Sequence, residues 1–111
     1  MSPRLTSAMI VSALLRLTER ESGFGTVIAR GDESAGAIII LLAERGRRVG
    51  VLERLLGPHG NYAWMESIAA QNEAEIDKFL EKRRRFDPDL WVIELDTASA
   101  ERFAAEIIAL D

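Results

Sequence analysis

The spacing of hydrophobic and polar residues near the start of the chain predicts a helix. Ser2 is suited to cap this helix, Pro3 to occupy its first position, and Gly23 to end it. The apolar side chains between these points recur at helical spacing, which places them on one face: Met9, Ile10, Ala13, Leu14 and Leu17. We therefore expect this helix to pack on the rest of the fold through that face.

The middle of the chain changes to short runs that are rich in strand-forming residues and are separated by polar, glycine-containing turns. These runs predict successive antiparallel strands at residues 24–30, 37–43, 48–56 and 61–66, with a hairpin turn at residues 31–36. The run at 37–43 is apolar at every position, which is typical of a central strand with both faces covered. Because helices or a second copy of the chain must supply that cover, a homodimer is one expectation.

The remainder of the chain predicts a helix, a strand and a last helix. Asn72 followed by Glu75 resembles a capping box, and the helix that begins there should end before Pro88. Residues 90–95 form a fifth predicted strand, and Ser99 can cap the last helix. The residues of that helix expected to face inward are Ala100, Phe103, Ala104, Ile107 and Leu110.

These elements predict a single α+β domain over residues 1–111. The order along the chain is α-β-β-β-β-α-β-α, and the strands form one mainly antiparallel sheet of about five strands with helices packed on it.

The composition narrows the range of compartments and partners. The chain contains no cysteine, which excludes disulfides, thiolate metal sites and a cysteine nucleophile, and agrees with a reducing compartment. The net charge of −4 disfavours nucleic acid and anionic membranes as partners. No segment is long and apolar enough to span a bilayer. We therefore expect a soluble, cytoplasmic protein without a membrane partner.

Few residues offer catalytic or metal chemistry. His59 is the single histidine, and it is predicted to lie in an exposed turn, where a polar residue needs no further role. The chain has neither a Gly-x-Ser-x-Gly motif nor a phosphate-binding P-loop. One histidine without cysteine does not make a usual zinc site, so neither a metal nor a cofactor is expected.

Two polar segments, residues 30–36 and 83–91, hold the remaining candidates. Arginine suits phosphate, carboxylate and RNA bases, and paired aspartates can serve as acid and base. Each residue also has a structural explanation, because arginines in a last helical turn pair with nearby acids and favour the helix dipole, and tryptophan fills cores. The candidate ligand-binding residues are Arg30, Asp32, Arg84, Arg85, Asp87, Asp89 and Trp91.

Three stretches together carry a resemblance to a known family: Ser-Ala-Leu-Leu-Arg at residues 12–16, Arg-Gly-Asp leading to Ala-Gly-Ala at 30–37, and the arginine-rich segment 83–92. With them the chain resembles the bacterial proteins known as domain of unknown function 1491, over nearly its whole length. The resemblance implies one compact domain. No activity, cofactor or catalytic residue is established for that family, so the resemblance supplies no functional residue.

The scarcity of catalytic residue types favours a non-catalytic binding or protein-interaction domain. One alternative is a small enzyme that acts on an anionic metabolite. Its residues would be Arg30, Arg84 and Arg85 for binding and Asp32, His59 or Asp87 as acid or base. A second alternative is weak RNA or DNA binding through residues 82–85 at the helix end. A ligand site is favoured if segments 30–36 and 83–91 meet around one cavity.

Overall fold

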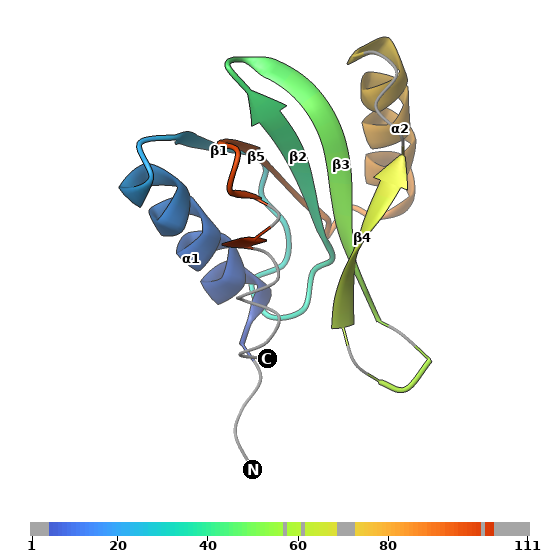
Figure 1. The fold of residues 1–111 in the computed structure, drawn as a ribbon. Coiled ribbons are helices and arrows are strands. Elements are labelled where there is room, and N and C mark those ends of the chain that lie inside the picture. Colours follow the sequence, from blue (N-terminus) through green and yellow to red (C-terminus); the bar gives the residue numbers. More distant parts are fainter. Residues whose placement is uncertain (1–4, 57, 61, 69–72, 101, 104–111) are drawn as a thin grey trace.

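The structure, a computed structural model, contains two helices and five strands within the described residues 5–56, 58–60, 62–68, 73–100 and 102–103 (Figure 1). Their bounds in chain order are α1 Ser7–Arg20, β1 Phe24–Ala29, β2 Ile38–Glu44, β3 Arg47–Leu56, β4 Tyr62–Ile68, α2 Glu73–Phe86 and β5 Trp91–Asp96. This order confirms the predicted α+β class and each of the five predicted strands.

Strand β2 is the central strand of the sheet, as its apolar sequence predicts. The strand order is β1-β5-β2-β3-β4, and every pair is antiparallel except the parallel pair of β2 and β5. On one face Ile38 and Ile40 pack with Ile10 and Leu14 of α1, and on the other face Ile39 and Leu41 pack against α2. Figure 1 shows the two helices on opposite sides of the sheet. The chain's own helices therefore cover both faces of β2.

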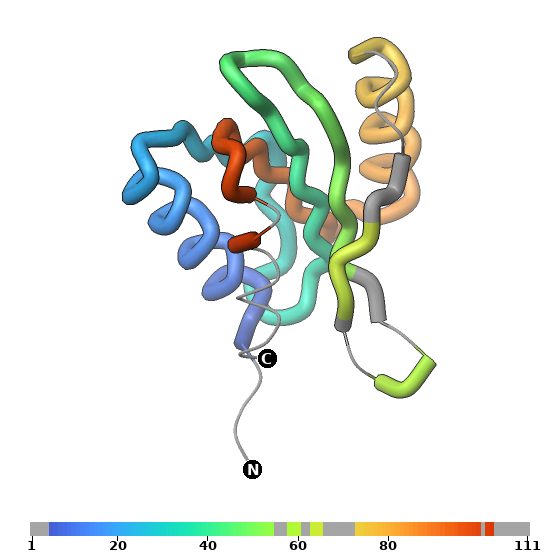
Figure 2. The backbone as a smooth tube through the Cα atoms, viewed as in Figure 1, coloured from blue at the N-terminus to red at the C-terminus, as the bar shows by residue number. Residues whose placement is uncertain are grey.

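The predicted hairpin between β1 and β2 is wrong, because β5 lies between these strands. β5 is buried at Trp91, Val92, Ile93 and Leu95, whereas β1 is exposed at most positions. Composition alone does not explain this placement, because β5 carries Glu94 and Asp96 whereas β1 carries no charged residue. Its result is that the four apolar side chains of β5 lose their contact with water. Residues 30–37 are consequently a crossover loop around the end of β5, which follows the aqua part of the tube in Figure 2.

Hydrogen bonds fix this crossover loop to the start of β5. The amide of Asp32 donates to the carbonyl of Asp89 at 3.0 Å, and the amide of Trp91 donates to the carbonyl of Ala37 at 2.8 Å. The indole Nε1 of Trp91, whose side chain is buried, donates to the carbonyl of Asp32 at 2.7 Å. Segments 30–36 and 83–91 therefore meet, and Trp91 is confirmed as a core residue.

The same loop also caps α1. The amides of Ser7 and Ala8 donate to the carbonyls of Ser34 and Glu33, and the buried Ser7 Oγ donates to the carbonyl of Gly36 at 2.6 Å. Helix starts leave such amides without intrahelical partners. The loop thus satisfies donors that water would otherwise have to reach.

Both ends of α1 differ from the sequence prediction. The helix begins at Ser7, and the Thr6 hydroxyl caps it by accepting from the amide of Met9 at 3.2 Å; Ser2 and Pro3 lie outside the described residues. At the other end the helix stops at Arg20, and Ser22, with φ of 64°, adopts the left-handed conformation one residue before Gly23, which was predicted to end the helix. Gly23 serves packing instead, because a Cβ there would overlap the carbonyl oxygen of Asp96.

The second half of the chain follows its prediction where the structure describes it. Helix α2 ends at Phe86, before Pro88, as expected; its predicted cap Asn72 lies outside the described residues. Ala100 and Phe103 are buried against the α1 face of the sheet. The other inward positions predicted for the last helix, Ala104, Ile107 and Leu110, lie outside the described residues. Neither of the described helices α1 and α2 could cross a bilayer.

Substitution of Gly36 tests the role of the crossover loop. A Cβ at this position would overlap the carbonyl oxygen of Asp89, so Gly36→Ala should lower the free energy of unfolding by about 3 kcal/mol. Gly46 is a matched control, because its Cβ would meet open space and only its φ of 81° is unfavourable to alanine. Gly46→Ala should cost about 1 kcal/mol. Equal losses in urea denaturation would contradict the proposed packing of the loop against β5.

Candidate functional site

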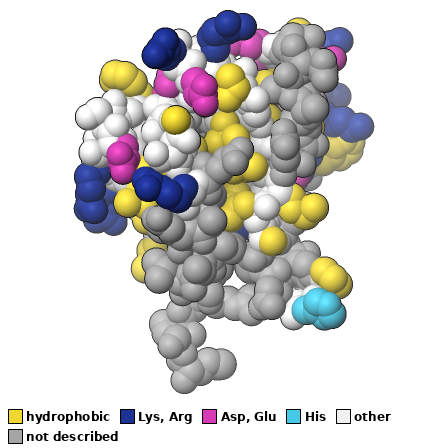
Figure 3. All heavy atoms as spheres, in the orientation of Figure 1, with side chains coloured by type: hydrophobic (Ala, Val, Ile, Leu, Met, Phe, Trp, Pro, Cys, Tyr) yellow, Lys and Arg dark blue, Asp and Glu magenta, His cyan; other side chains and the backbone are white. Residues whose placement is uncertain are grey.

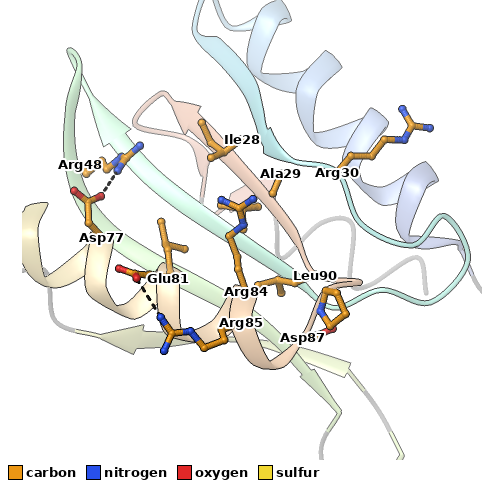
Figure 4. Close-up of a pocket in the computed structure, with 13 residues that line it drawn as sticks. Ile28, Ala29, Arg30, Arg48, Asp77, Glu81, Arg84, Arg85, Asp87 and Leu90 are labelled. Atoms are coloured by element: carbon orange, nitrogen blue, oxygen red, sulfur yellow. Dashed lines mark hydrogen bonds and ion pairs between the residues drawn. The ribbon is translucent and has the colours of Figure 1, made fainter.

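A groove of about 850 Å³ lies between α2 and the β1 side of the sheet (Figure 4). Its floor is apolar and consists of Leu80 of α2 and of Leu90 and Val92 of the β5 region, all three of which are buried. Its charged residues come from α2 and the residue that follows it, from β3 and from the segment after β1. The complete lining is Ile28, Ala29, Arg30, Arg48, Asp77, Leu80, Glu81, Arg84, Arg85, Asp87, Pro88, Leu90 and Val92.

Arg84 stands in the groove without an ionic partner among the described residues. It follows the buried residues Ile76 and Leu80 at intervals of four, so it continues their face of α2 toward the sheet. Figure 4 shows its guanidinium group pointing across the groove toward Ile28 and Ala29. A cation above an apolar floor is suited to hold an anion that also has an apolar part.

The neighbouring arginines point elsewhere, because consecutive helical residues face different directions. Arg83 forms an ion pair with the buried Glu53 of β3, and its guanidinium carbon lies 5.9 Å from the centroid of the Phe79 ring. Arg85 pairs with Glu81 at 3.3 Å on the exposed side of the helix. The basic run at residues 82–85 therefore does not present its charges on one surface, which weakens the case for nucleic acid.

At the opposite end of the groove, Arg48 connects three elements of the fold. Its Nε donates to Glu94 of β5 at 2.8 Å, and its Nη1 lies 3.1 Å from Asp77 of α2. The hydrogen bond to Glu94 raises the pKa of Arg48, against an opposing effect of burial, and the charges of Glu94, Asp77 and Glu73 add to the increase. The contacts of Arg48 thus hold α2 against the sheet.

The predicted residues of the first polar segment serve the crossover loop more than the groove. Arg30 pairs with Glu33 at 3.1 Å and lies over the Trp91 ring, 5.7 Å from its centroid. Figure 4 shows its guanidinium group pointing away from Arg84, so it lines the groove but does not join Arg84 in it. The Asp32 carboxylate accepts from the amides of Ser34 and Ala35 and so closes the loop's turn.

The two aspartates beside Pro88 have different roles, one in the groove and one at the crossover loop. Asp87 lines the groove, and its carboxylate accepts from the amide of Asp89 at 3.2 Å. Asp89 contacts the crossover loop through its backbone carbonyl and is not part of the groove lining. Of the seven predicted ligand-binding residues, Arg30, Arg84, Arg85 and Asp87 line the groove, and the guanidinium groups of Arg30 and Arg85 are engaged with neighbouring acids.

His59 lies in the loop between β3 and β4, where Pro58, His59 and Gly60 are exposed. Figure 3 shows the histidine side chain at the edge of the molecule. Neither His59 nor Asp32 is among the residues that line the groove. Of the three acid–base residues proposed for the enzyme alternative, Asp32, His59 and Asp87, Asp87 alone lines this groove.

The sequence interpretation missed Arg48 and the apolar floor. The link from Arg48 to Glu94 spans β2, and it follows from a pairing in which Ala43 lies between Arg48 and Asp96. No local spacing along the chain indicates that pairing.

Comparison with known proteins gives a family and several related structures. The family model described as "Protein of unknown function (DUF1491)" matches residues 5–105. No curated protein matches the sequence.

A solution structure of a protein from A. tumefaciens is 35% identical, with a TM-score of 0.73 over 86% of this chain and 87% of that one. Two structures of DUF1491 family proteins from Caulobacter crescentus are also similar. The crystal structure is 29% identical, with a TM-score of 0.78 over 89% of this chain and 94% of that one. The NMR structure is 28% identical, with a TM-score of 0.81 over 93% and 94%.

The contrast between Arg48 and Arg84 predicts opposite effects on stability. Arg48→Met removes charge-assisted hydrogen bonds and should lower the free energy of unfolding by about 1–3 kcal/mol. Arg84→Met removes the same charge from the same groove but breaks no ion pair with a described residue, so its effect should stay within about 0.5 kcal/mol. Urea denaturation of both variants checks the pair. A large loss for Arg84→Met would mean that Arg84 serves the fold.

Proposed function

The chain belongs to the DUF1491 family, whose function is unknown, and we propose from its groove that it is a non-catalytic binding domain. The ligands are molecules or peptide segments that combine a carboxylate with an apolar body. The observation that carries this proposal is Arg84, which stands over an apolar floor without an ionic partner among the described residues.

The surroundings of Arg84 favour a carboxylate over a more highly charged anion. Glu81 and Asp87 also line the groove, and Asp77 lies at its far end. These acids would repel a phosphate with two negative charges, whereas one carboxylate matches Arg84, the one arginine of the groove lining that has no ionic partner among the described residues. Arginine holds a carboxylate in a planar, two-pronged contact that lysine cannot form.

The floor supplies the second part of the recognition. Leu80, Leu90 and Val92 close it from below, while Ile28 is 40% exposed at its margin. An apolar body laid on Ile28 would remove this surface from water, at about 25 cal/mol for each Å² buried. A ligand with only one of the two features would lose either the ion pair or the burial.

Two expectations from the sequence remain proposals. Cytoplasmic location is supported by the lack of cysteine in the sequence. The homodimer was expected as a cover for β2, but α1 and α2 supply that cover within one chain. A dimer would therefore have to use another surface, and light scattering at several protein concentrations tests it.

Binding of phenylbutyrate tests the proposed recognition, since this probe joins a carboxylate to an apolar ring. In an NMR titration, wild-type protein should bind phenylbutyrate about tenfold more tightly than the neutral phenylbutyramide. Arg84→Met should abolish the difference. Lys82→Met is the matched control, because Lys82 is an exposed residue of the same helix outside the groove lining. Equal binding of acid and amide by the wild-type protein would refute the proposal.

A further inference from the structure

We infer that the ligand of this groove is an extended peptide that adds as a strand to the free edge of β1 and places an acidic side chain on Arg84. The inference rests on the proposed function and specifies the class of ligand. It joins two features that lie side by side: the groove, and the edge strand whose last residues, Ile28 and Ala29, form one of its walls.

The free edge of β1 is unusually open to pairing. β1 is the first strand of the sheet order, and β5 is the only described strand that pairs with it. Its sequence, Phe-Gly-Thr-Val-Ile-Ala, contains no charged residue and no proline, which are two of the features that commonly prevent another strand from pairing with an edge. Its apolar side chains are also exposed, with Phe24 at 76% and Val27 at 42%.

A β-bulge limits where a peptide can pair. The register of β1 with β5 shifts between Val27 and Ala29, so Ile28 is the bulged residue. Regular pairing of an added strand is therefore confined to residues 24–27, because a bulge interrupts the ladder. The bulge also turns the end of β1, which is where the groove begins.

The direction of the peptide follows from the position of Arg84 together with a preference for antiparallel pairing. The groove lining includes Ile28, Ala29 and Arg30 but no residue of 24–27, so Arg84 lies beside the C-terminal end of β1. Antiparallel pairing is slightly more stable per residue than parallel pairing. In that arrangement the N-terminal part of the peptide reaches Ile28 and Ala29, and an acidic residue near the peptide's N-terminus meets Arg84.

Charge around the edge supports an acidic peptide as the occupant. Arg30 and Arg85 lie on the same lining as Arg84, although each already has one exposed acidic neighbour. A peptide with a single acidic side chain complements these groups without adding the charge that Glu81 and Asp87 would repel, and exposed ion pairs of this kind are exchanged at little cost.

The test uses blocked peptides of about seven residues that alternate valine and threonine. One carries glutamate near its N-terminus, one carries the same glutamate near its C-terminus, and one carries glutamine in place of the N-terminal glutamate. The first should bind about tenfold more tightly than the other two. Arg84→Met should remove this preference, and Lys82→Met should keep it.

Amide hydrogen exchange separates strand addition from contact with Arg84 alone. The outward-facing amides among residues 24–27 should exchange more slowly when the peptide is bound, and N-methylation of the peptide should abolish this protection. Adjacent strand residues present their amides to opposite edges. Of Thr26→Pro and Val27→Pro, one therefore removes an outward donor and leaves β5 paired. The variant that keeps the wild-type melting temperature should lose peptide binding.

The outcomes distinguish this inference from the proposed function. If phenylbutyrate recognises Arg84 but the peptides leave the amides of β1 unprotected, the strand addition is wrong and the proposed function stands. If neither probe depends on Arg84, both fail. If the amides are protected without peptide and the protection grows with protein concentration, a second copy of the chain occupies the edge and the peptide is the wrong occupant.

Discussion

The insertion of β5 between β1 and β2 is the constraint on which the rest of the structure depends. It makes the chain cross from β1 to β2 around the first residues of β5, and the crossover loop then meets two elements at once. The loop exchanges hydrogen bonds with Asp89 and Trp91 on one side, and its carbonyl groups accept from the first turn of α1 on the other. Sheet order, helix capping and the packing of Gly31 and Gly36 against Asp89 are therefore one connected arrangement.

The sequence predicts the elements well because each is specified by residues close together in the chain. The apolar run of β2 requires cover on both faces, and Pro88 requires α2 to end before it. The error at residues 31–36 has a different origin. A turn rich in glycine and acids is compatible with a hairpin and with a crossover, and the choice depends on β5, which lies more than fifty residues later in the chain. Local pattern cannot report competition between distant strands for the interior position.

The candidate site shows the same division. The arginine run is visible in the sequence, but which arginine faces the groove depends on the contacts of its neighbours. Arg83 forms an ion pair with the buried Glu53 of β3, and Arg85 forms one with Glu81. Arg84 instead faces the sheet, at the place where α2 does not cover β1. The carboxylates of Asp32 and Asp87, two of the predicted aspartates, accept hydrogen bonds from nearby backbone amides. Short acidic side chains near turns bind local amides more readily than they serve distant ligands.

The groove and the open edge follow from one topological fact. Because β5 takes the interior position, β1 is left at the border of the sheet, and α2 packs mainly over β2, β3 and β5 with only Ala29 of β1 at its margin. The uncovered strip between α2 and the border contains both the apolar floor and Arg84. A strand added to β1 would extend the sheet in the direction in which the helix does not cover it. The same placement of β5 that stabilises the core thus puts a strand edge and an arginine beside each other, and neither has a partner in the part of the chain that the structure describes.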